Sequence, residues 1–491
     1  MSQLIKLSVV EALAGLQKKA FSATELTQSY LDQMEKTKSH NAYITATPER
    51  ALADAARSDE QWAKGTPGPL EGIPIAVKDV YCTKGILTTN ASKMLHNFIP
   101  PYESHVTEKV AAAGTVLLGK TNMDEFCMGS ATTPVHTGPT LNPWNTACTA
   151  GGSSGGSAVA VANCSALIAL GTDTGGSVRQ PAAFCGVVGV KPSYGRCSRW
   201  GVISYASSLD TPGAFARTVH DAALLLNVMA GHDPKDATSI DTPRPDFAAS
   251  IGQSVAGKKV GIPKEWYDNA QLDPAVMALW QQGQAILKEA GCEIVYVSLP
   301  YSNYALSCYY ILACAEAASN LQRYDGVKYG FRAADINSLE DMYFQTRGQG
   351  FGPEVKRRIL IGTYVLSHGY YEAYYAKAQK VRGIIQHDFR TVFDQVDVVL
   401  TPTTPTPAFP LSAPAEDPVA MYWNDVLTVP VNIGNVTALS VPGGMSDQGL
   451  PLGLQIIAPT LCETRLFQFG HVIQDGTFMP DLPFSKPVTK E

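Results

Sequence analysis

The sequence predicts an α/β protein in which helices cover both faces of a central mixed β-sheet. Short runs rich in Val and Ile alternate with helical stretches from residue 72 onward, which is typical of such a sheet. Charged residues make up 17% of the 491-residue chain, below the roughly 25% of an average globular protein, which indicates a large interior. The expected strands are residues 73–77, 115–118, 166–170, 260–262, 294–297 and 396–400.

Residues 1–60 form a predicted helical lead-in. Ser8 and Ser22 each have a glutamate three residues later, the capping-box pattern, followed by apolar residues at helical spacing. No repeat or low-complexity linker divides the chain, so we expect one domain over residues 1–491 with a flexible tail at 480–491. Residues 233–254 are an expected surface excursion, and the Thr-Pro steps after residue 400 are an expected ordered loop.

Composition excludes several classes of protein. The net charge of −6 lacks the basic excess of a nucleic-acid or anionic-membrane binder, and we expect the basic run at 356–358 to be a solvated helix face. Ten cysteines without a C-x-x-C pair indicate free thiols in a reducing compartment. With no signal peptide and no long apolar run, we expect a cytoplasmic protein without a membrane partner.

Two Gly/Ser loops flank a short apolar run within residues 150–177, which contain seven Gly and five Ser. Such loops allow backbone N–H groups to converge on an anion. A flexible linker would not contain the apolar runs AVAVA and ALIAL. We therefore interpret both loops as parts of an active site.

Three familiar enzyme patterns do not fit this region. Residues 114–121 match the phosphate-loop pattern, but Thr-Val-Leu-Leu within them is typical of a buried strand. Residues 151–155 match the nucleophile elbow of α/β-hydrolases, but coil precedes them and none of the nine His lies in a triad context. No ligand spacing for a metal occurs, so no metal site is predicted.

A lysine base remains as the alternative to histidine. A buried lysine can be neutral because desolvation lowers its pKa, and it can then activate a serine. Lys78 ends an alternating apolar run that begins at Gly72, which would carry it into the core. It is therefore the candidate base.

Three segments together resemble the amidase-signature family: GIPIAVKD at 72–79, GGSSGGS at 151–157 and DTGGSVRQPAAFCG at 173–186. The resemblance implies the amidase-signature fold and a Ser-cisSer-Lys triad at Ser177, Ser153 and Lys78. The two serines are 24 residues apart, as in that family. The implied route passes protons from Ser177 through Ser153 to Lys78, and Ser177 attacks a carboxamide to form an acyl-enzyme. The amides of Thr174, Gly175, Gly176 and Ser177 would bind the oxyanion.

Other stretches resemble one branch of that family, the A subunits of bacterial glutamyl-tRNA(Gln)/aspartyl-tRNA(Asn) amidotransferases. These stretches are residues 122–130, 315–326, 350–367, 399–409 and 422–432. The resemblance implies that glutamine donates ammonia. It further implies a heterotrimer in which the B subunit uses ATP and Mg and makes most contacts with misacylated tRNA, beside a C subunit. No cofactor is expected in this chain.

Glutamine needs a cation for its α-carboxylate and an anion for its α-ammonium group. The resemblance implies Arg357 or Arg358 for the first and Asp425 for the second, and we expect Arg358 rather than Arg357. It also places Tyr309, Gly129 and Ser130 at the substrate.

Three segments depart from the family pattern: Ala150, residues 131–139 and residues 211–213. None includes a triad residue, but the second lies near the expected substrate mouth. Two alternatives to a glutaminase subunit therefore stay open. One is a stand-alone amidase that acts on another small amide, and the other is a catalytically silent scaffold subunit.

Overall fold

The computed structural model describes residues 3–268, 271–412 and 421–477. Its centre is one 11-stranded sheet with the order β1-β3-β2-β4-β6-β5-β10-β11-β9-β7-β8. The strands are β1 Tyr43–Ala46, β2 Pro74–Lys78, β3 Val116–Thr121, β4 Ile168–Asp173, β5 Val188–Lys191, β6 Thr211–Ala216, β7 Lys259–Pro263, β8 Glu293–Val297, β9 Val398–Pro402, β10 Thr437–Met445 and β11 Pro451–Ala458. Parallel and antiparallel pairs both occur, so the predicted mixed sheet is confirmed.

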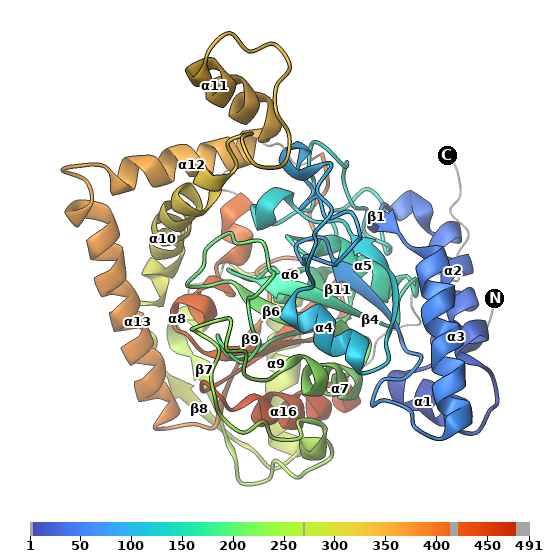
Figure 1. Ribbon diagram of the computed structural model, residues 1–491. Coiled ribbons are helices and arrows are strands. Elements are labelled where there is room, and N and C mark those ends of the chain that lie inside the picture. Colours follow the sequence, from blue (N-terminus) through green and yellow to red (C-terminus); the bar gives the residue numbers. More distant parts are fainter. Residues whose placement is uncertain (1–2, 269–270, 413–420, 478–491) are drawn as a thin grey trace.

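Helices surround this sheet, and Figure 1 shows α11 projecting from the body. The α-helices are α1 Val9–Gln17, α2 Ala23–Lys36, α3 Pro48–Lys64, α4 His105–Ala112, α5 Gly155–Ala162, α6 Arg179–Cys185, α7 Val219–Met229, α8 Lys264–Asp268, α9 Pro274–Glu289, α10 Ala305–Asn320, α11 Leu339–Gly350, α12 Pro353–Leu366, α13 Lys377–Phe393, α15 Val429–Ile433 and α16 Glu463–Gly476. Shorter turns include η4 Glu125–Cys127, η6 Ser302–Tyr304, η7 Leu321–Arg323, the π-helical η8 Glu372–Ala376 and η9 Trp423–Asp425.

Two neighbouring residues of β11 show that both faces of the sheet are covered. A Cβ at Gly453 would meet Ala183 of α6, whereas the side chain of Leu454 lies against Gly283 of α9. Successive side chains of a strand point to opposite faces. Helices α6 and α9 therefore lie on opposite sides of the sheet, as predicted.

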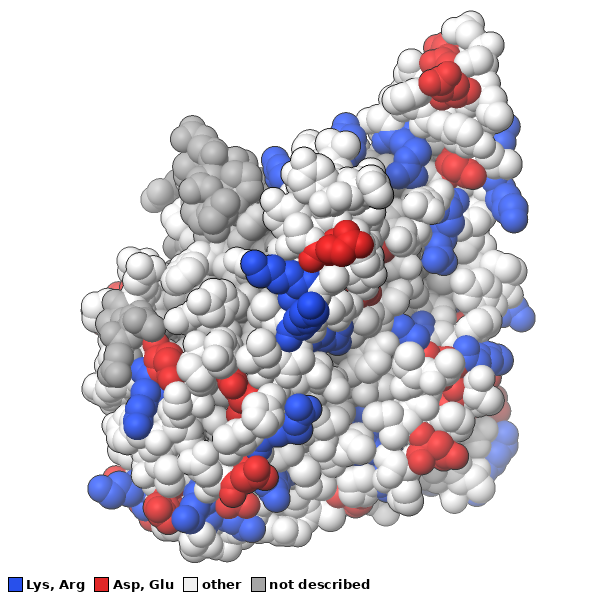
Figure 2. All heavy atoms as spheres, turned by 90° about the vertical axis from the view of Figure 1, so that its left-hand side faces the viewer, with Lys and Arg blue, Asp and Glu red and all other residues white. Residues whose placement is uncertain are grey.

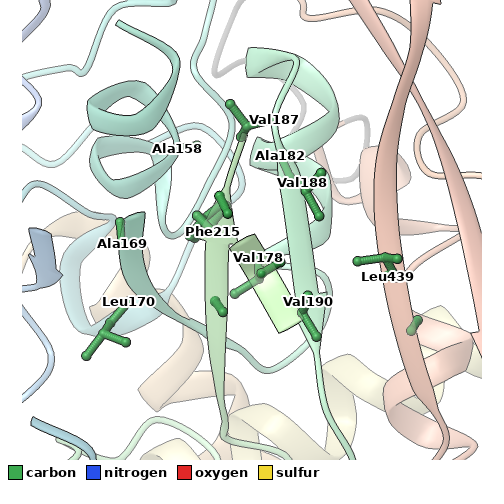
Figure 3. Close-up of a cluster of buried hydrophobic side chains, with 14 of the residues drawn as sticks. Ala158, Ala169, Leu170, Val178, Ala182, Val187, Val188, Val190, Phe215 and Leu439 are labelled. Atoms are coloured by element: carbon green, nitrogen blue, oxygen red, sulfur yellow. The ribbon is translucent and has the colours of Figure 1, made fainter. Parts of the chain in front are cut away.

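The core beside the site is made of small and branched side chains. Figure 3 shows Leu170 of β4, Val190 of β5, Phe215 of β6 and Leu439 of β10 in this cluster, together with Val178 beside α6. All are fully buried. The tight packing leaves little room for the two Gly/Ser loops to shift.

All six predicted strands are present, with ends that shift by a few residues. Ser8 and Ser22 form complete capping boxes at α1 and α2. The helical lead-in needs one correction, because Tyr43–Ala46 pairs antiparallel with β3; its aromatic and β-branched residues favour a strand. The false phosphate loop is β3, as the sequence indicates.

Some of the remaining fold predictions concern described residues, and others do not. All ten cysteines are free thiols. Among the described residues, no helix has both the length and the apolar character needed to cross a membrane. The predicted tail at 480–491 lies outside the described residues, and the single-domain organisation stays a prediction.

Candidate active site

Strands β2 and β4 are parallel neighbours, so their carboxyl ends meet at one edge of the sheet. Lys78 is the last residue of β2, and Asp173, the last residue of β4, leads directly into the loop that contains Ser177. The other Gly/Ser loop precedes α5 and contains Ser153. Both predicted loops and the predicted base are thus brought together at this edge.

The Lys78 side chain is completely buried. Its Nζ lies 2.8 Å from Ser153 Oγ, 2.8 Å from Ser154 Oγ and 2.9 Å from Thr172 Oγ1. Burial lowers the pKa of Lys78, although Cys127 and Asp124 raise it in part. The Ser154 hydroxyl also lies 3.2 Å from the Thr172 carbonyl oxygen, to which it donates, so it can accept from Lys78.

These contacts suit an uncharged amine. A neutral –NH₂ group has two hydrogens to donate and one lone pair. Donation to Ser154 and Thr172 leaves the lone pair facing the Ser153 hydroxyl, the position that a base needs.

The peptide bond between Gly152 and Ser153 is cis. The amide of the next residue, Ser154, donates to the Ser177 carbonyl oxygen at 3.2 Å. This bond joins the two predicted serine loops directly. Ser177 retains 8% of its exposure, more than the fully buried Ser153, which suits a nucleophile that must reach a substrate.

Asp173 organises the loop that carries Ser177. Its carboxylate accepts from the amides of Gly176 at 3.0 Å and Val178 at 3.2 Å, and from the Arg179 guanidinium at 2.9 and 3.0 Å. Burial opposes ionisation, but the charge and hydrogen bonds of Arg179 lower the pKa of Asp173 to about 2. The carboxylate is therefore charged at neutral pH, and its hydrogen bonds to backbone amides fix the conformation of the loop.

This arrangement changes the predicted oxyanion hole. The Gly176 amide points at Asp173 and is not free to bind an oxyanion, so Gly176 leaves the predicted set. Within the described part of the chain, no acceptor takes the amide hydrogens of Thr174, Gly175 or Ser177. Thr174, Gly175 and Ser177 therefore remain as candidate donors.

Glycine is required at two positions of this loop. A Cβ at Gly175 would lie 2.7 Å from the Tyr309 ring, and one at Gly176 would lie 2.2 Å from Thr428 Oγ1. Gly176 also has a φ of +139°, which disfavours other residues. Tyr309, on α10, thus lies against the loop.

The predicted substrate residues Ser130 and Asp425 touch each other. Ser130 Oγ donates to Asp425 Oδ2 at 2.5 Å. Burial raises the pKa of Asp425 to about 7, with Ser130 and Arg358 opposing the shift. Gly129 precedes this pair, and a Cβ there would lie 2.5 Å from the Asp124 carboxyl carbon.

The two candidate arginines differ in burial and in their hydrogen-bond partners. The Arg358 side chain is 3% exposed and donates to Glu354 at 2.8 Å and to the Tyr205 hydroxyl at 2.7 Å. Arg357 is 44% exposed and pairs with Glu354 at the surface. The solvated-face prediction thus holds for Lys356 and Arg357 but is wrong for Arg358, which α12 turns toward the rings of Tyr310 and Tyr422.

A cavity of 210 Å³ opens beside these groups. Its lining includes Asp124, Gly129, Val135, Glu354, Arg357 and Tyr422. Because Gly129 adjoins Ser130 and Glu354 holds Arg358, the cavity is the candidate mouth for substrate. Among the described residues, no group of three or more His, Cys, Asp or Glu side chains could hold a metal ion.

The amidase family profile matches residues 25–467, which is most of the chain. The protein belongs to the amidase family.

Relatives of this amidase cover almost its whole length. The A subunit of the glutamyl-tRNA(Gln) amidotransferase of Azorhizobium caulinodans is 53% identical over 97% of this chain and 98% of the relative. That of Rhodospirillum rubrum is 52% identical over 98% and 97% of the two chains. The crystal structure of the A subunit from Thermotoga maritima has a TM-score of 0.82 and 36% identity, and covers 99% of both chains.

A bacterial aryl acylamidase of the amidase-signature enzymes has a TM-score of 0.87 at 25% identity over 99% of this chain and 100% of that one. The predicted family and fold are thus confirmed.

Sequence reasoning missed several partners of the amidase site. Ser154 and Thr172 touch the Lys78 amine, and Cys127 Sγ lies 3.6 Å from Thr172 Oγ1. Ser154 belongs to the Gly/Ser loop at 151–157, so a second serine near Lys78 could have been predicted from the sequence. Nothing in the sequence indicated that Thr172 or Cys127 would point toward Lys78.

The departures at 131–139 are built into the catalytic loops. Thr132 Oγ1 donates to the Gly151 carbonyl oxygen at 2.7 Å and accepts from the Gly155 amide at 3.0 Å. Ala150 is fully buried, and residues 211–213 belong to β6, paired with β4. The unusual residues therefore support the loops rather than interrupt them.

Proposed function

We propose that this amidase is the glutaminase subunit of a tRNA-dependent amidotransferase. The observation that carries the proposal is the buried Lys78 amine, which faces the Ser153 hydroxyl beside a loop with unpaired amides. The proposal of glutamine as substrate rests on the likeness to A subunits over almost the full chain and on the buried charges of Arg358 and Asp425.

Acylation begins with proton transfer. Ser177 gives its proton to Ser153 as Ser153 gives one to the neutral Lys78 amine, and Ser177 Oγ attacks the glutamine carboxamide carbon. The oxyanion that forms lies against free amides of residues 174, 175 and 177; loss of one such donor typically costs about 3–4 kcal/mol. The C–N bond then breaks, and the relay returns a proton to the leaving nitrogen, which departs as ammonia. Water hydrolyses the glutamyl ester of Ser177 and regenerates the enzyme.

Two buried groups of opposite charge recognise the ends of glutamine. Arg358 takes the α-carboxylate, because its guanidinium is fixed by Glu354 and Tyr205. Asp425 takes the α-ammonium group, with Ser130 holding its carboxylate in place. A fixed pair of this kind selects an amino acid over a simple amide, because an unpaired buried charge is costly.

The ammonia then serves a B subunit that activates Glu-tRNA(Gln), or Asp-tRNA(Asn), with ATP and Mg. The heterotrimer includes a C subunit, the tRNA is held mainly by B, and the compartment is the cytoplasm. One uncovered face suits such a partner. Exposed apolar side chains lie on α12 at Leu360, Ile361 and Tyr364, between α12 and η8 at Tyr370 and Tyr371, and on η8 at Tyr374. Figure 2 turns this side to the viewer and shows it mostly uncharged, as expected where a subunit docks.

Co-expression with the B and C subunits tests the proposal. Ammonia release from glutamine is measured with the chain alone, with the assembled complex, and with the complex plus each misacylated tRNA. We expect release by the complex and stimulation by tRNA, both lost in the matched Ser177→Ala complex. Robust hydrolysis of aryl amides by the isolated chain, without stimulation by partners, would instead establish a stand-alone amidase like the aryl acylamidase of the same fold.

A further inference from the structure

A second cavity, of 620 Å³, is lined in part by residues of the segment 199–210. Its lining shares no residue with the 210 Å³ cavity at the substrate mouth. Three partly exposed aromatic side chains, Tyr102, Trp200 and Tyr329, belong to its wall. We call these three residues the aromatic rim. The ring centroids of Tyr102 and Trp200 lie 6.1 Å apart at an interplanar angle of 48°, so these two rings are neighbours in the rim.

The charges in this cavity are unbalanced. Arg199 is neutralised by Asp236 through bonds of 2.7 and 3.1 Å. Lys235 Nζ instead lies 5.4 Å from the Trp200 ring centroid, and Arg323 donates through Nε to a backbone carbonyl at 2.9 Å. Neither Lys235 nor Arg323 forms an ion pair with a described residue. Lys235 lies close enough to Asp233 to contribute to the lowered pKa of that carboxyl, but neither cation is held in an ion pair by the residues that the structure describes, and both are therefore available to an outside anion.

The remaining acidic residue of the cavity wall, Asp210, has hydrogen-bond donors from its own surroundings in the protein. Its carboxylate accepts from the Thr174 hydroxyl at 2.8 Å and from the amides of Tyr205 at 2.9 Å and Ala206 at 3.1 Å. It therefore faces the catalytic loop, and does not balance Lys235 or Arg323.

We propose that this cavity binds a nucleotide, with its base stacked on the aromatic rim and its phosphate held by Lys235 and Arg323. Aromatic rings accept the flat face of any base, and Lys or Arg supplies the charge for phosphate. The occupant is either a free nucleotide or an unpaired nucleotide of an RNA, since both present this chemistry. The site goes beyond the glutaminase activity and does not depend on it.

The wall connects this cavity to the glutamine site. Residues 199–210 contribute Trp200, Ser207 and Asp210 to the cavity. From the same segment, Asp210 holds Thr174 of the oxyanion loop, and the Tyr205 hydroxyl accepts from Arg358. A ligand that orders this segment therefore acts on both a transition-state group and a substrate group, so occupancy should change the KM or kcat for glutamine.

Binding is tested by calorimetry on the full chain, alone and with its partner subunits. The probes are adenosine 5′-monophosphate, adenosine, inorganic phosphate and a six-nucleotide single-stranded RNA. We expect the monophosphate to bind more tightly than adenosine or phosphate. Loss of a stacking ring should weaken binding by about tenfold or more in Trp200→Ala, whereas Trp200→Phe should stay within about threefold of the wild type. Lys235→Gln with Arg323→Gln should remove the preference for the monophosphate over adenosine.

Tyr301→Ala serves as the matched control, because this ring is similarly exposed but lies outside the cavity. RNA that binds at least tenfold more tightly than the monophosphate, with the same sensitivity to Trp200→Ala, assigns the site to RNA; equal binding assigns it to a free nucleotide. The proposal is refuted if neither the monophosphate nor the RNA binds at millimolar concentration. It is also refuted if the cavity variants bind the monophosphate as tightly as Tyr301→Ala does. Nucleotide binding to an assembled complex that hydrolyses no glutamine would refute the glutaminase proposal and leave this one standing.

Discussion

Replacement of Lys78 by Met tests the proposed mechanism most directly. Methionine has nearly the length and volume of lysine but no amine. In the variant the Ser153 hydroxyl loses its bond to Lys78, whereas Ser154 keeps its bond to the Thr172 carbonyl oxygen. The substitution therefore removes the terminal base and its three contacts with hydroxyl groups, while it preserves packing.

The expected effect on the rate is large and that on stability is modest. A positioned general base contributes about 10²- to 10⁴-fold, so we expect kcat to fall by about 10³-fold, or roughly 4 kcal/mol of activation free energy. The free energy of unfolding should change by less than about 3 kcal/mol, because the loss of a partner by three buried hydroxyls is offset as the cost of burying an amine disappears.

Lys120→Met is the matched control, since Lys120 is equally buried but lies 3.2 Å from Asp79. Its loss leaves Asp79 without a countercharge, which should lower the free energy of unfolding by about 3–5 kcal/mol. The kcat per folded molecule should fall less than tenfold. Glutaminase assays and denaturant titrations of both variants measure these quantities. The mechanism is refuted if Lys78→Met keeps more than a tenth of wild-type kcat, or if its loss only follows unfolding.

Three further predictions concern the substrate and the nucleophile. Ser177→Ala should abolish acylation, so mass spectrometry after mixing with labelled glutamine should find no glutamyl adduct; an adduct on the variant would disprove the assignment. Arg358→Gln should raise the KM for glutamine by tenfold or more, from loss of a charged hydrogen bond worth about 1.5–3 kcal/mol, while Arg357→Gln should change it less than threefold; the reverse order would favour Arg357. Because burial raises the pKa of Asp425 to about 7, its neutral form prevails at pH 6 and its ionised form at pH 8. The KM should therefore fall as pH rises through 7, and this trend should vanish in Asp425→Asn; a pH dependence that persists there belongs to another group.

Much of this site could be predicted from residues that are near in sequence. The apolar run before Lys78 indicated a strand that carries a lysine inward, and β2 does so. The choice between Arg357 and Arg358 was also within reach. Val355, Arg358, Gly362 and Val365 are the buried positions of α12, and their spacing of three and four residues is that of one helix face.

The direction of backbone amides could not be predicted in this way. Gly176 lies in the middle of the Gly-Gly-Ser loop, and the sequence alone does not distinguish which amide of this loop faces a substrate. Its amide turns to Asp173 because that carboxylate is held in place by Arg179, Asn432 and the end of β4. Asn432 is 259 residues away from Asp173 in the chain. The shape of the loop thus depends on a contact that no local pattern contains.

Burial alone does not identify a catalytic lysine in this fold. Lys120 is buried with the carboxylate of Asp79, which favours its charged form and makes it a poor base. Lys191 is buried without such a partner, and burial lowers its pKa to about 7. However, its Nζ faces the carbonyl oxygens of Pro192 and Val436, which have no proton to give. Of these three lysines, Lys78 is the one whose amine faces a serine hydroxyl beside the loop of Ser177. A neutral amine at that position can accept the proton of Ser153, and Ser153 can in turn accept the proton of Ser177.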